Sequence, residues 1–132
     1  MPLTSSVDGK TTADAYIRRI DVSSGNRAAL VKRNGKYEEV TWQEIHRFVT
    51  GVFHSYQKAG IVKGDRVCIL SGSRIEWNIV DLANLCSGAV TVPIYQSNIA
   101  EDVAYIIKHS GAKNVTMHRA VWQAVSKAVT EN

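Results

Sequence analysis

The sequence contains few of the residues that mark specialised proteins. It has only two cysteines, Cys68 and Cys86, both in apolar runs, and no CxxC pair or Cys/His cluster. This excludes a disulfide-dense miniprotein and argues against a metal site. His46 and His54 are eight residues apart, a spacing that does not place two ligands on adjacent helical turns. The longest uncharged stretch, residues 82–100, is interrupted by polar residues and a proline, so it does not predict a membrane span.

The chain also lacks a dense stripe of positive charge. Its net charge is +4, from 16 Lys and Arg against 12 Asp and Glu, and all of the excess lies in the first 66 residues. Only Arg18-Arg19 and Lys32-Arg33 are adjacent basic pairs. A nucleic-acid surface usually needs a denser patch, so we expect a solvated face and no nucleic-acid partner. The first residues carry no charged segment followed by an apolar core, so we expect no secretory signal.

What remains is the composition of one soluble globular domain. The 132 residues are 45% hydrophobic and 21% charged, which is ordinary for a chain with a single core. Asn34-Gly35 between two strand-like runs predicts a β-hairpin, because both positions accept a positive φ. Apolar runs and three- to four-residue periodicities then alternate. The predicted elements are a helix at 13–20, the hairpin at 27–33 and 36–41, helices at 42–59, 75–86, 98–110 and 121–128, and strands at 66–70, 89–94 and 113–117.

This alternation of strands and helices predicts an α/β fold. Helices of this length between strands imply right-handed βαβ units and a parallel sheet flanked by helices, preceded by the N-terminal hairpin. We expect a flexible N-terminus with a short helix over 1–26 and an α/β subdomain over 27–132. Thr12 is the expected cap of the first helix. Ser or Thr followed three residues later by Glu predicts a capping box at Thr41, and Ser73 and Asn98 repeat the spacing.

The carboxyl ends of parallel strands are where open α/β sheets bind ligands. Two predicted turns lie there. The first is formed by Ser71, Gly72, Ser73 and Arg74, and it is a candidate anion-binding turn. Its simpler interpretation is that Ser73 caps the following helix while Gly72 makes the turn. The second turn contains Tyr95, Gln96 and Ser97.

No other catalytic pattern accompanies these turns. The chain contains no P-loop, no GxGxxG motif and no GxSxG elbow beside a histidine. Trp42 and Trp77 fall on apolar helix faces, which favours a core position over a stacking platform. Residue types alone therefore predict no catalytic residue and no metal ligand.

The order of several short segments is nevertheless familiar. It resembles the N-terminal region of adenylate-forming (AMP-binding) enzymes, most closely the long-chain fatty acid CoA ligases. Where many relatives have Ser-Pro this chain has Ile99-Ala100, and Arg74-Ile75 stands where Arg-Pro is common. The segments that carry the resemblance are 37–42 (YEEVTW), 60–70 (GIVKGDRVCIL), 74–77 (RIEW), 88–98 (GAVTVPIYQSN), 103–107 (VAYII) and 110–113 (SGAK).

The resemblance implies a two-step reaction for a full-length enzyme. A fatty acid carboxylate attacks the α-phosphate of ATP to give an acyl-adenylate and pyrophosphate, and the thiol of CoA then displaces AMP. ATP, Mg²⁺ and CoA are the implied cofactors. The family's Pro-Lys-Gly phosphate loop, Tyr-Gly-x-Thr-Glu segment and lid lysine do not occur in these 132 residues. We therefore expect a scaffold fragment that is inactive alone, in which Tyr95, Gln96 and Ser97 line the substrate cleft.

Two other functions stay open. A part-sheet cut from a larger domain exposes apolar surface and an unpaired strand edge, so the chain is a candidate interaction module that self-associates. A freestanding nucleotide-binding α/β domain is the third hypothesis. For the full-length enzyme, the resemblance implies a cytoplasmic location, including at the periphery of a membrane.

Overall fold

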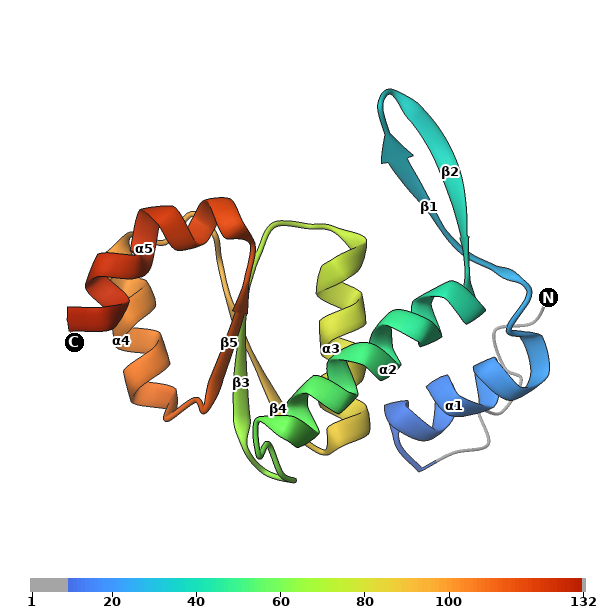
Figure 1. Cartoon of the computed structure of the whole chain (residues 1–132), viewed down its shortest axis with the longest axis horizontal. Coiled ribbons are helices and arrows are strands. Elements are labelled where there is room, and N and C mark those ends of the chain that lie inside the picture. The colour runs from blue at the N-terminus through green and yellow to red at the C-terminus, as the bar shows by residue number, and fades with distance from the viewer. Residues whose placement is uncertain (1–9, 132) are drawn as a thin grey trace. The chain divides into compact units, whose positions relative to one another are not determined.

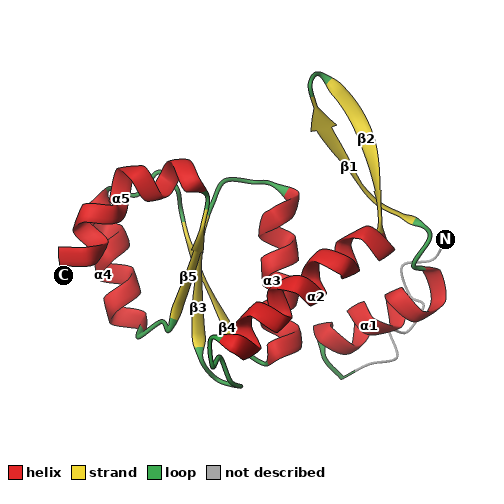
Figure 2. Cartoon of the chain, viewed as in Figure 1, coloured by secondary structure: helices red, strands yellow, loops and turns green. Residues whose placement is uncertain are grey.

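The structure is a computed structural model that describes residues 10–131 (Figure 1). The predicted flexible N-terminus, residues 1–26, lies partly outside this range, since residues 1–9 are not described. Two compact units are present, residues 1–48 and residues 49–132. Figure 2 shows the helices and strands, which are α1 (Thr12–Ser23), β1 (Arg27–Arg33), β2 (Lys36–Thr41), α2 (Trp42–Lys58), β3 (Arg66–Leu70), α3 (Ile75–Ser87), β4 (Val90–Ile94), α4 (Ala100–Ser110), β5 (Asn114–Met117) and α5 (Arg119–Glu131).

The first unit contains α1, the hairpin and the start of α2. The hairpin is confirmed at its predicted bounds, and Asn34 and Gly35 have φ values of 48° and 80°. Helix α1 is longer than predicted and is capped by Thr11, whose hydroxyl accepts the Asp14 amide hydrogen at 3.1 Å. The cap falls there because the Asp14 carboxylate in turn accepts the amide of Thr11, which closes a capping box.

A buried contact joins the two helices of the first unit. Tyr16 on α1 is 4% exposed, and its hydroxyl shares a 2.9 Å hydrogen bond with Nδ1 of His46 on α2. The Tyr16 ring also lies 6.4 Å from the ring of Trp42, measured between centroids. His46 therefore has a structural partner.

The second unit contains a parallel three-stranded sheet in the order β4-β3-β5. After β3 the chain runs through α3 and returns as β4, which pairs with one side of β3. It then runs through α4 and returns as β5, which pairs with the other side of β3. The two crossover helices consequently lie on opposite faces of the sheet (Figure 1). This confirms the predicted α/β class and the parallel βαβ units.

The core follows from the central position of β3. Residues Val67 to Leu70 are at most 1% exposed, as predicted for a parallel strand covered on both faces. Cys68 and Leu70 pack with Val103 of α4 and Val125 of α5. On the other face, α3 covers the sheet with a cluster of buried residues, Ile79, Val80, Ala83 and Asn84.

The predicted capping boxes divide into one that is confirmed and two that are wrong. Glu44 Oε2 accepts the Thr41 amide at 2.8 Å, and Thr41 accepts the Glu44 amide at 3.2 Å. Ser73 does not cap α3, because Glu76 is bound by Arg74 at 3.0 Å and the helix begins one residue later. Asn98 does not cap α4, because Ile99 is the N-cap residue and no side chain caps the helix. The backbone N–H of Asn98 donates to the Tyr95 carbonyl within the preceding turn.

Burial is low on the β4 and α3 side of the sheet. Strand β4 is a sheet edge among the described residues, and Val90 is 49% exposed. Helix α3 is buried on one face only, since Leu82, Leu85 and Cys86 remain half-buried. Trp77, predicted for the core, is likewise half-buried.

Candidate functional site

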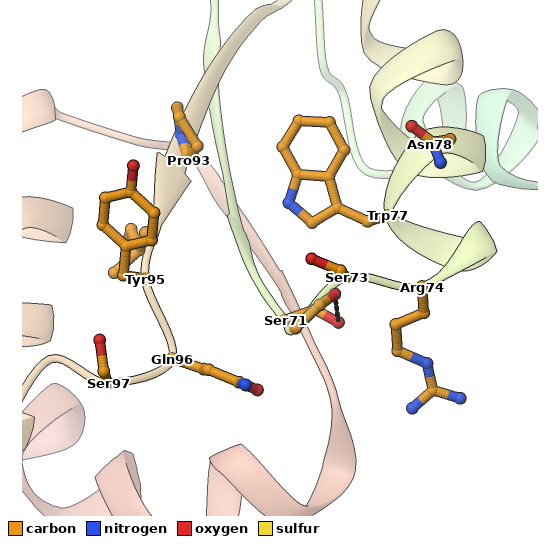
Figure 3. A pocket seen from close by; sticks show the side chains of 11 residues that line it. Ser71, Ser73, Arg74, Trp77, Asn78, Pro93, Tyr95, Gln96 and Ser97 are labelled. Atoms are coloured by element: carbon orange, nitrogen blue, oxygen red, sulfur yellow. Dashed lines mark hydrogen bonds between the residues drawn. The ribbon is translucent and has the colours of Figure 1, made fainter.

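The two sequence-predicted turns meet at the carboxyl ends of β3 and β4. They line one open pocket with a volume of about 750 Å³ (Figure 3). The β3 turn contributes Ser71, Gly72, Ser73 and Arg74, and the β4 turn contributes Tyr95, Gln96 and Ser97. The two turns meet because β3 and β4 are parallel and adjacent, so their carboxyl ends share one edge of the sheet. The other lining residues are Trp77, Asn78, Pro93 and Ile94.

Two aromatic rings flank this strand-end pocket. Trp77 extends from the first turn of α3 and Tyr95 from the end of β4, and their rings stand on opposite sides of the space (Figure 3). Tyr95 is 81% exposed, so its ring is available to a ligand or to another segment of polypeptide. The sequence did not predict Trp77 as a pocket residue, because Trp77 lies on the apolar face of its helix and this pattern is typical of a core position.

A second cavity lies on the other side of the β3 turn. It has a volume of about 290 Å³ and lies between the carboxyl ends of β3 and β5. Ser71 and Arg74 of the predicted anion-binding turn line it, whereas Gly72 and Ser73 do not. His118 and Arg119 form the facing wall. The sequence held a signal for them, because they follow directly after the predicted strand 113–117.

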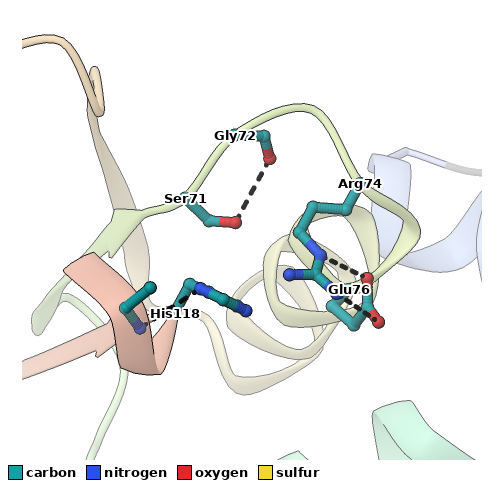
Figure 4. A network of polar contacts seen from close by, with 6 residues as sticks. Ser71, Gly72, Arg74, Glu76 and His118 are labelled. Carbon is teal, nitrogen blue, oxygen red and sulfur yellow. Dashed lines mark hydrogen bonds and ion pairs between the residues drawn. The ribbon is translucent and has the colours of Figure 1, made fainter. Parts of the chain in front are cut away.

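The polar groups of this second cavity are held in defined positions (Figure 4). Arg74 binds Glu76 through Nε and Nη2, at 3.0 and 3.3 Å. His118 Nδ1 accepts the amide hydrogen of Ala120 at 3.3 Å, which makes His118 the cap of α5. The neutral imidazole therefore carries its hydrogen on Nε2, and this nitrogen is a donor. Ser71 donates to the Gly72 carbonyl at 3.2 Å, so its hydroxyl hydrogen is already used.

At the opposite end of the sheet, a second polar cluster anchors the strands. Asp65 is 8% exposed and accepts the Val62 amide at 2.8 Å and the Lys113 ammonium at 2.9 Å. These contacts, the Val62 amide foremost, lower the pKa of Asp65 below its ordinary value. Arg66 donates to the carbonyls of Ser110 and Gly111, which close helix α4. This cluster is structural and lies at the amino ends of the strands, away from the two cavities.

The residues of the two cavities do not suit a metal ion. Within the described range 10–131, no three His, Cys, Asp or Glu side chains lie together as the ligands of a metal ion would. The two cavities contain hydroxyl, amide, imidazole and guanidinium groups with a single carboxylate, Glu76. Such a donor set fits anionic or neutral polar groups and does not fit Mg²⁺, which prefers carboxylate oxygens. Across residues 10–131, no helix is long and apolar enough to cross a membrane.

Comparison with known proteins places these features in a family. Over 79 residues the chain is 39% identical to the long-chain-fatty-acid–CoA ligase FadD15 of Mycobacterium bovis, covering 60% of this chain and 13% of that protein. The fatty acyl-CoA synthetase A of Dictyostelium discoideum is 30% identical over 114 residues, which cover 82% of this chain and 17% of that protein. The chain thus spans less than a fifth of the length of these curated relatives.

Solved structures agree with the fold. A benzoate CoA ligase from Burkholderia xenovorans superimposes with a TM-score of 0.80 at 20% identity, covering 91% of this chain and 24% of that one. The AMP-binding enzyme family matches residues 18–132, which is most of the sequence. The βαβ architecture, the hairpin and the segment order all lie within that match. The chain therefore belongs to the AMP-binding enzymes, the adenylate-forming ligases.

Proposed function

We propose that this chain is the N-terminal part of a long-chain fatty acid CoA ligase and serves as scaffold within it. The observation that carries the proposal is the family match over residues 18–132, together with curated relatives that are fatty acid CoA ligases. The implied reaction joins a fatty acid to CoA, uses ATP and passes through an acyl-adenylate. The implied location is the cytoplasm, including the surface of a membrane.

Within that enzyme, the strand-end pocket is a wall of the substrate cleft. Tyr95, Gln96 and Ser97 form one side, and Trp77 forms the other. The aromatic rings offer apolar area at a low cost in conformational entropy, and the amide and hydroxyl groups orient a polar group. The pocket is open to solvent on its remaining side, which suits a wall that a further part of the polypeptide completes.

The chain alone is proposed to be inactive. Both steps of the reaction develop charge that ordered donors, a lysine and Mg²⁺ stabilise. The family's motifs for these groups do not occur in the 132 residues, and the two cavities contain no lysine. The purified chain should show no fatty-acid-dependent exchange of pyrophosphate into ATP above the background without enzyme. A rate that depends on fatty acid and on protein concentration contradicts the proposal of inactivity.

Calorimetry separates the scaffold from a freestanding nucleotide-binding domain. Titrating the chain with ATP, AMP and CoA should release no binding heat if it is a scaffold. Saturable heat with ATP or AMP supports the nucleotide-binding domain instead. The variant Tyr95→Ala then locates the binding site, because loss of the heat in this variant assigns the binding to the strand-end pocket.

The second candidate function is self-association through a sheet edge, and the backbone favours β5 over β4 for this role. In a parallel strand the N–H and C=O of one residue point to the same side, and those of Val90 point to β3 because its amide donates to Asp65. Pro93 therefore faces outward on β4 and offers no N–H there. On β5, Lys113 donates toward β3, so Asn114 and Thr116 face outward with their N–H groups.

We infer that β5, rather than β4, is the edge through which two copies pair. Light scattering at increasing concentration should show a dimer. The variant Asn114→Pro, which removes one outward donor while leaving the bonds to β3, should reduce its fraction. Circular dichroism checks that the variant keeps its fold. A monomer at every concentration of the unmodified chain contradicts the inference.

A further inference from the structure

The second cavity lies at the switch point of the sheet. From β3 the chain turns to β4 on one side and reaches β5 on the other, so the loops after β3 and β5 lead to opposite faces. In open α/β sheets the crevice between two such loops is where ligands bind. The cavity of about 290 Å³ bounded by Ser71, Arg74, His118 and Arg119 occupies this crevice.

The lining of this switch-point cavity defines what it can hold. Its inner wall is apolar and is built by Ile69, Val80, Met117 and the Trp77 ring. Its polar lining residues include His118 and Arg74, and Figure 4 shows the His118 ring and the Arg74 side chain extending into the same space. The lining therefore combines apolar surface with a few polar groups, as in most small-molecule sites. The volume is at the low end for such sites, which selects a compact ligand.

The charges at the polar end favour an anion. The charge of Arg74 is neutralised by Glu76, which is bound by Nε and Nη2 of the guanidinium group. The third nitrogen, Nη1, takes no part in these two bonds. Arg119 forms no ion pair with any residue in the range 10–131. His118 presents Nε2–H because Nδ1 is occupied by the Ala120 amide. The lining residues thus include two arginines and an imidazole donor against one carboxylate, an excess of one positive charge.

We propose that the switch-point cavity binds a compact anion, a carboxylate or phosphate attached to a small apolar group, with Arg119 and His118 as the recognising residues. This cavity adjoins the strand-end pocket, with which it shares Ser71, Arg74 and Trp77, and it differs in the wall formed by His118 and Arg119. Binding here is a property of the 132-residue chain and does not depend on ligase activity.

The test is a titration of the ¹⁵N-labelled chain followed by NMR, with phenyl phosphate, phenylacetate and inorganic phosphate as three separate probes. Saturable shifts of the amides of Met117, His118 and Arg119, which line only this cavity, are expected with phenyl phosphate, phenylacetate or both, and the stronger probe identifies the head group. Inorganic phosphate should bind more weakly, because it leaves the apolar wall uncovered. Shifts confined to Tyr95 and Gln96, or no saturable shift with any probe, overturn the proposal.

Substitutions identify the recognising side chains. Arg119→Gln should weaken binding by about tenfold or more, since a hydrogen bond to a charged group is lost, while Arg119→Lys should recover much of the affinity. His118→Asn keeps an acceptor for the Ala120 amide but removes Nε2–H, and should weaken binding by about fivefold. Lys127→Gln, an equal charge change on the exposed side of α5, is the matched control and should change affinity by less than about twofold.

Two results of these variants contradict the site. If Arg119→Gln binds as tightly as the unmodified chain, Arg119 does not recognise the anion. If Lys127→Gln weakens binding as much as Arg119→Gln, the attraction is a general effect of net charge. Neither result touches the proposed ligase scaffold, which is tested by the exchange assay and by calorimetry with nucleotides.

Discussion

Gly72 and Gln96 are in contact across the strand-end pocket. A Cβ added to Gly72 would lie 2.8 Å from Oε1 of Gln96, closer than real Cβ atoms approach another heavy atom, and 3.0 Å from Nε2. The glycine therefore gives the Gln96 amide its position, and the two turns that the sequence presents 24 residues apart form one surface. The contact involves the far end of a flexible side chain, so it controls the shape of the pocket more than stability.

Substituting Gly72→Ala should consequently move Gln96 with little effect on folding. We expect the side-chain amide resonance of Gln96 to shift, while the free energy of unfolding changes by less than about 1 kcal/mol. Gly51→Ala is the matched control, because Gly51 lies inside α2 with nothing within 4 Å of the added Cβ. That variant should gain up to about 1 kcal/mol from helix propensity and leave the Gln96 resonance unchanged. A Gln96 amide that shifts equally in both variants rules out the contact.

The Asp65–Lys113 pair predicts a loss of stability in acid. The pKa of Asp65 is lowered in the folded chain, first by the Val62 amide and then by Lys113. Its contribution is thus fully present above the ordinary carboxyl range, and it is lost as the pH falls below about 4 through the folded-state pKa. Urea unfolding between pH 7 and pH 2.5 should show this fall, and Asp65→Asn should flatten it.

A residual fall is expected in Asp65→Asn, because the Thr41 amide and hydroxyl also lower the pKa of Glu44. Asp21→Asn on the exposed side of α1 is the control and should keep the full acid dependence. Equal pH profiles for Asp65→Asn and the unmodified chain would exclude a role for the pair in acid stability.

The two helix starts with Ser or Thr should respond differently to alanine. Thr41 accepts the Glu44 amide, so Thr41→Ala should lower the free energy of unfolding by about 1 kcal/mol. Ser73 makes no side-chain cap for α3, and Ser73→Ala should change it by less than about 0.5 kcal/mol. Chemical denaturation measures both. If Ser73→Ala lowered the free energy of unfolding by about 1 kcal/mol or more, this would support the Ser73 capping box that the sequence predicts.

Thr91 holds a buried polar group between β4 and α3. Its hydroxyl donates to Asp81 at 2.6 Å and accepts from Asn84 Nδ2 at 2.9 Å. Asn84 is fully buried, and its Oδ1 has no partner among residues 10–131. Thr91→Val keeps the shape but leaves the whole amide unpaired, which should cost about 1–3 kcal/mol.

Thr116→Val provides the comparison for that prediction. The Thr116 hydroxyl lies 3.5 Å from both the Tyr56 hydroxyl and Asn114 Oδ1, so its bonds are long. We expect this variant to lose less stability than Thr91→Val when both are unfolded in urea. A reversed order would mean that the Asn84 amide finds another partner when Thr91 is changed.

Local sequence signals predicted the elements well and their ends less well. The Asn34-Gly35 turn and the Thr41 cap act within a few residues, so no distant contact competes with them. The predicted cap at Ser73 is wrong, because the Glu76 carboxylate binds Arg74 instead of completing a capping box with Ser73. Sequence spacing alone does not decide between these two local partners. Trp77 was assigned to the core because periodicity shows which face of a helix is apolar but not how far the sheet extends beneath it.

For the site, the sequence determined which residues stand at the strand ends, since a turn follows each apolar run. It named Ser71 to Arg74 and Tyr95 to Ser97 without showing that they share a pocket. The strand order β4-β3-β5 decided that, and it also placed His118 and Arg119 against Ser71 and Arg74. Strand order depends on the crossovers of α3 and α4, which are long-range packing choices. The sequence by itself therefore determined the family and the local turns, while only the tertiary structure decided which turns face one another.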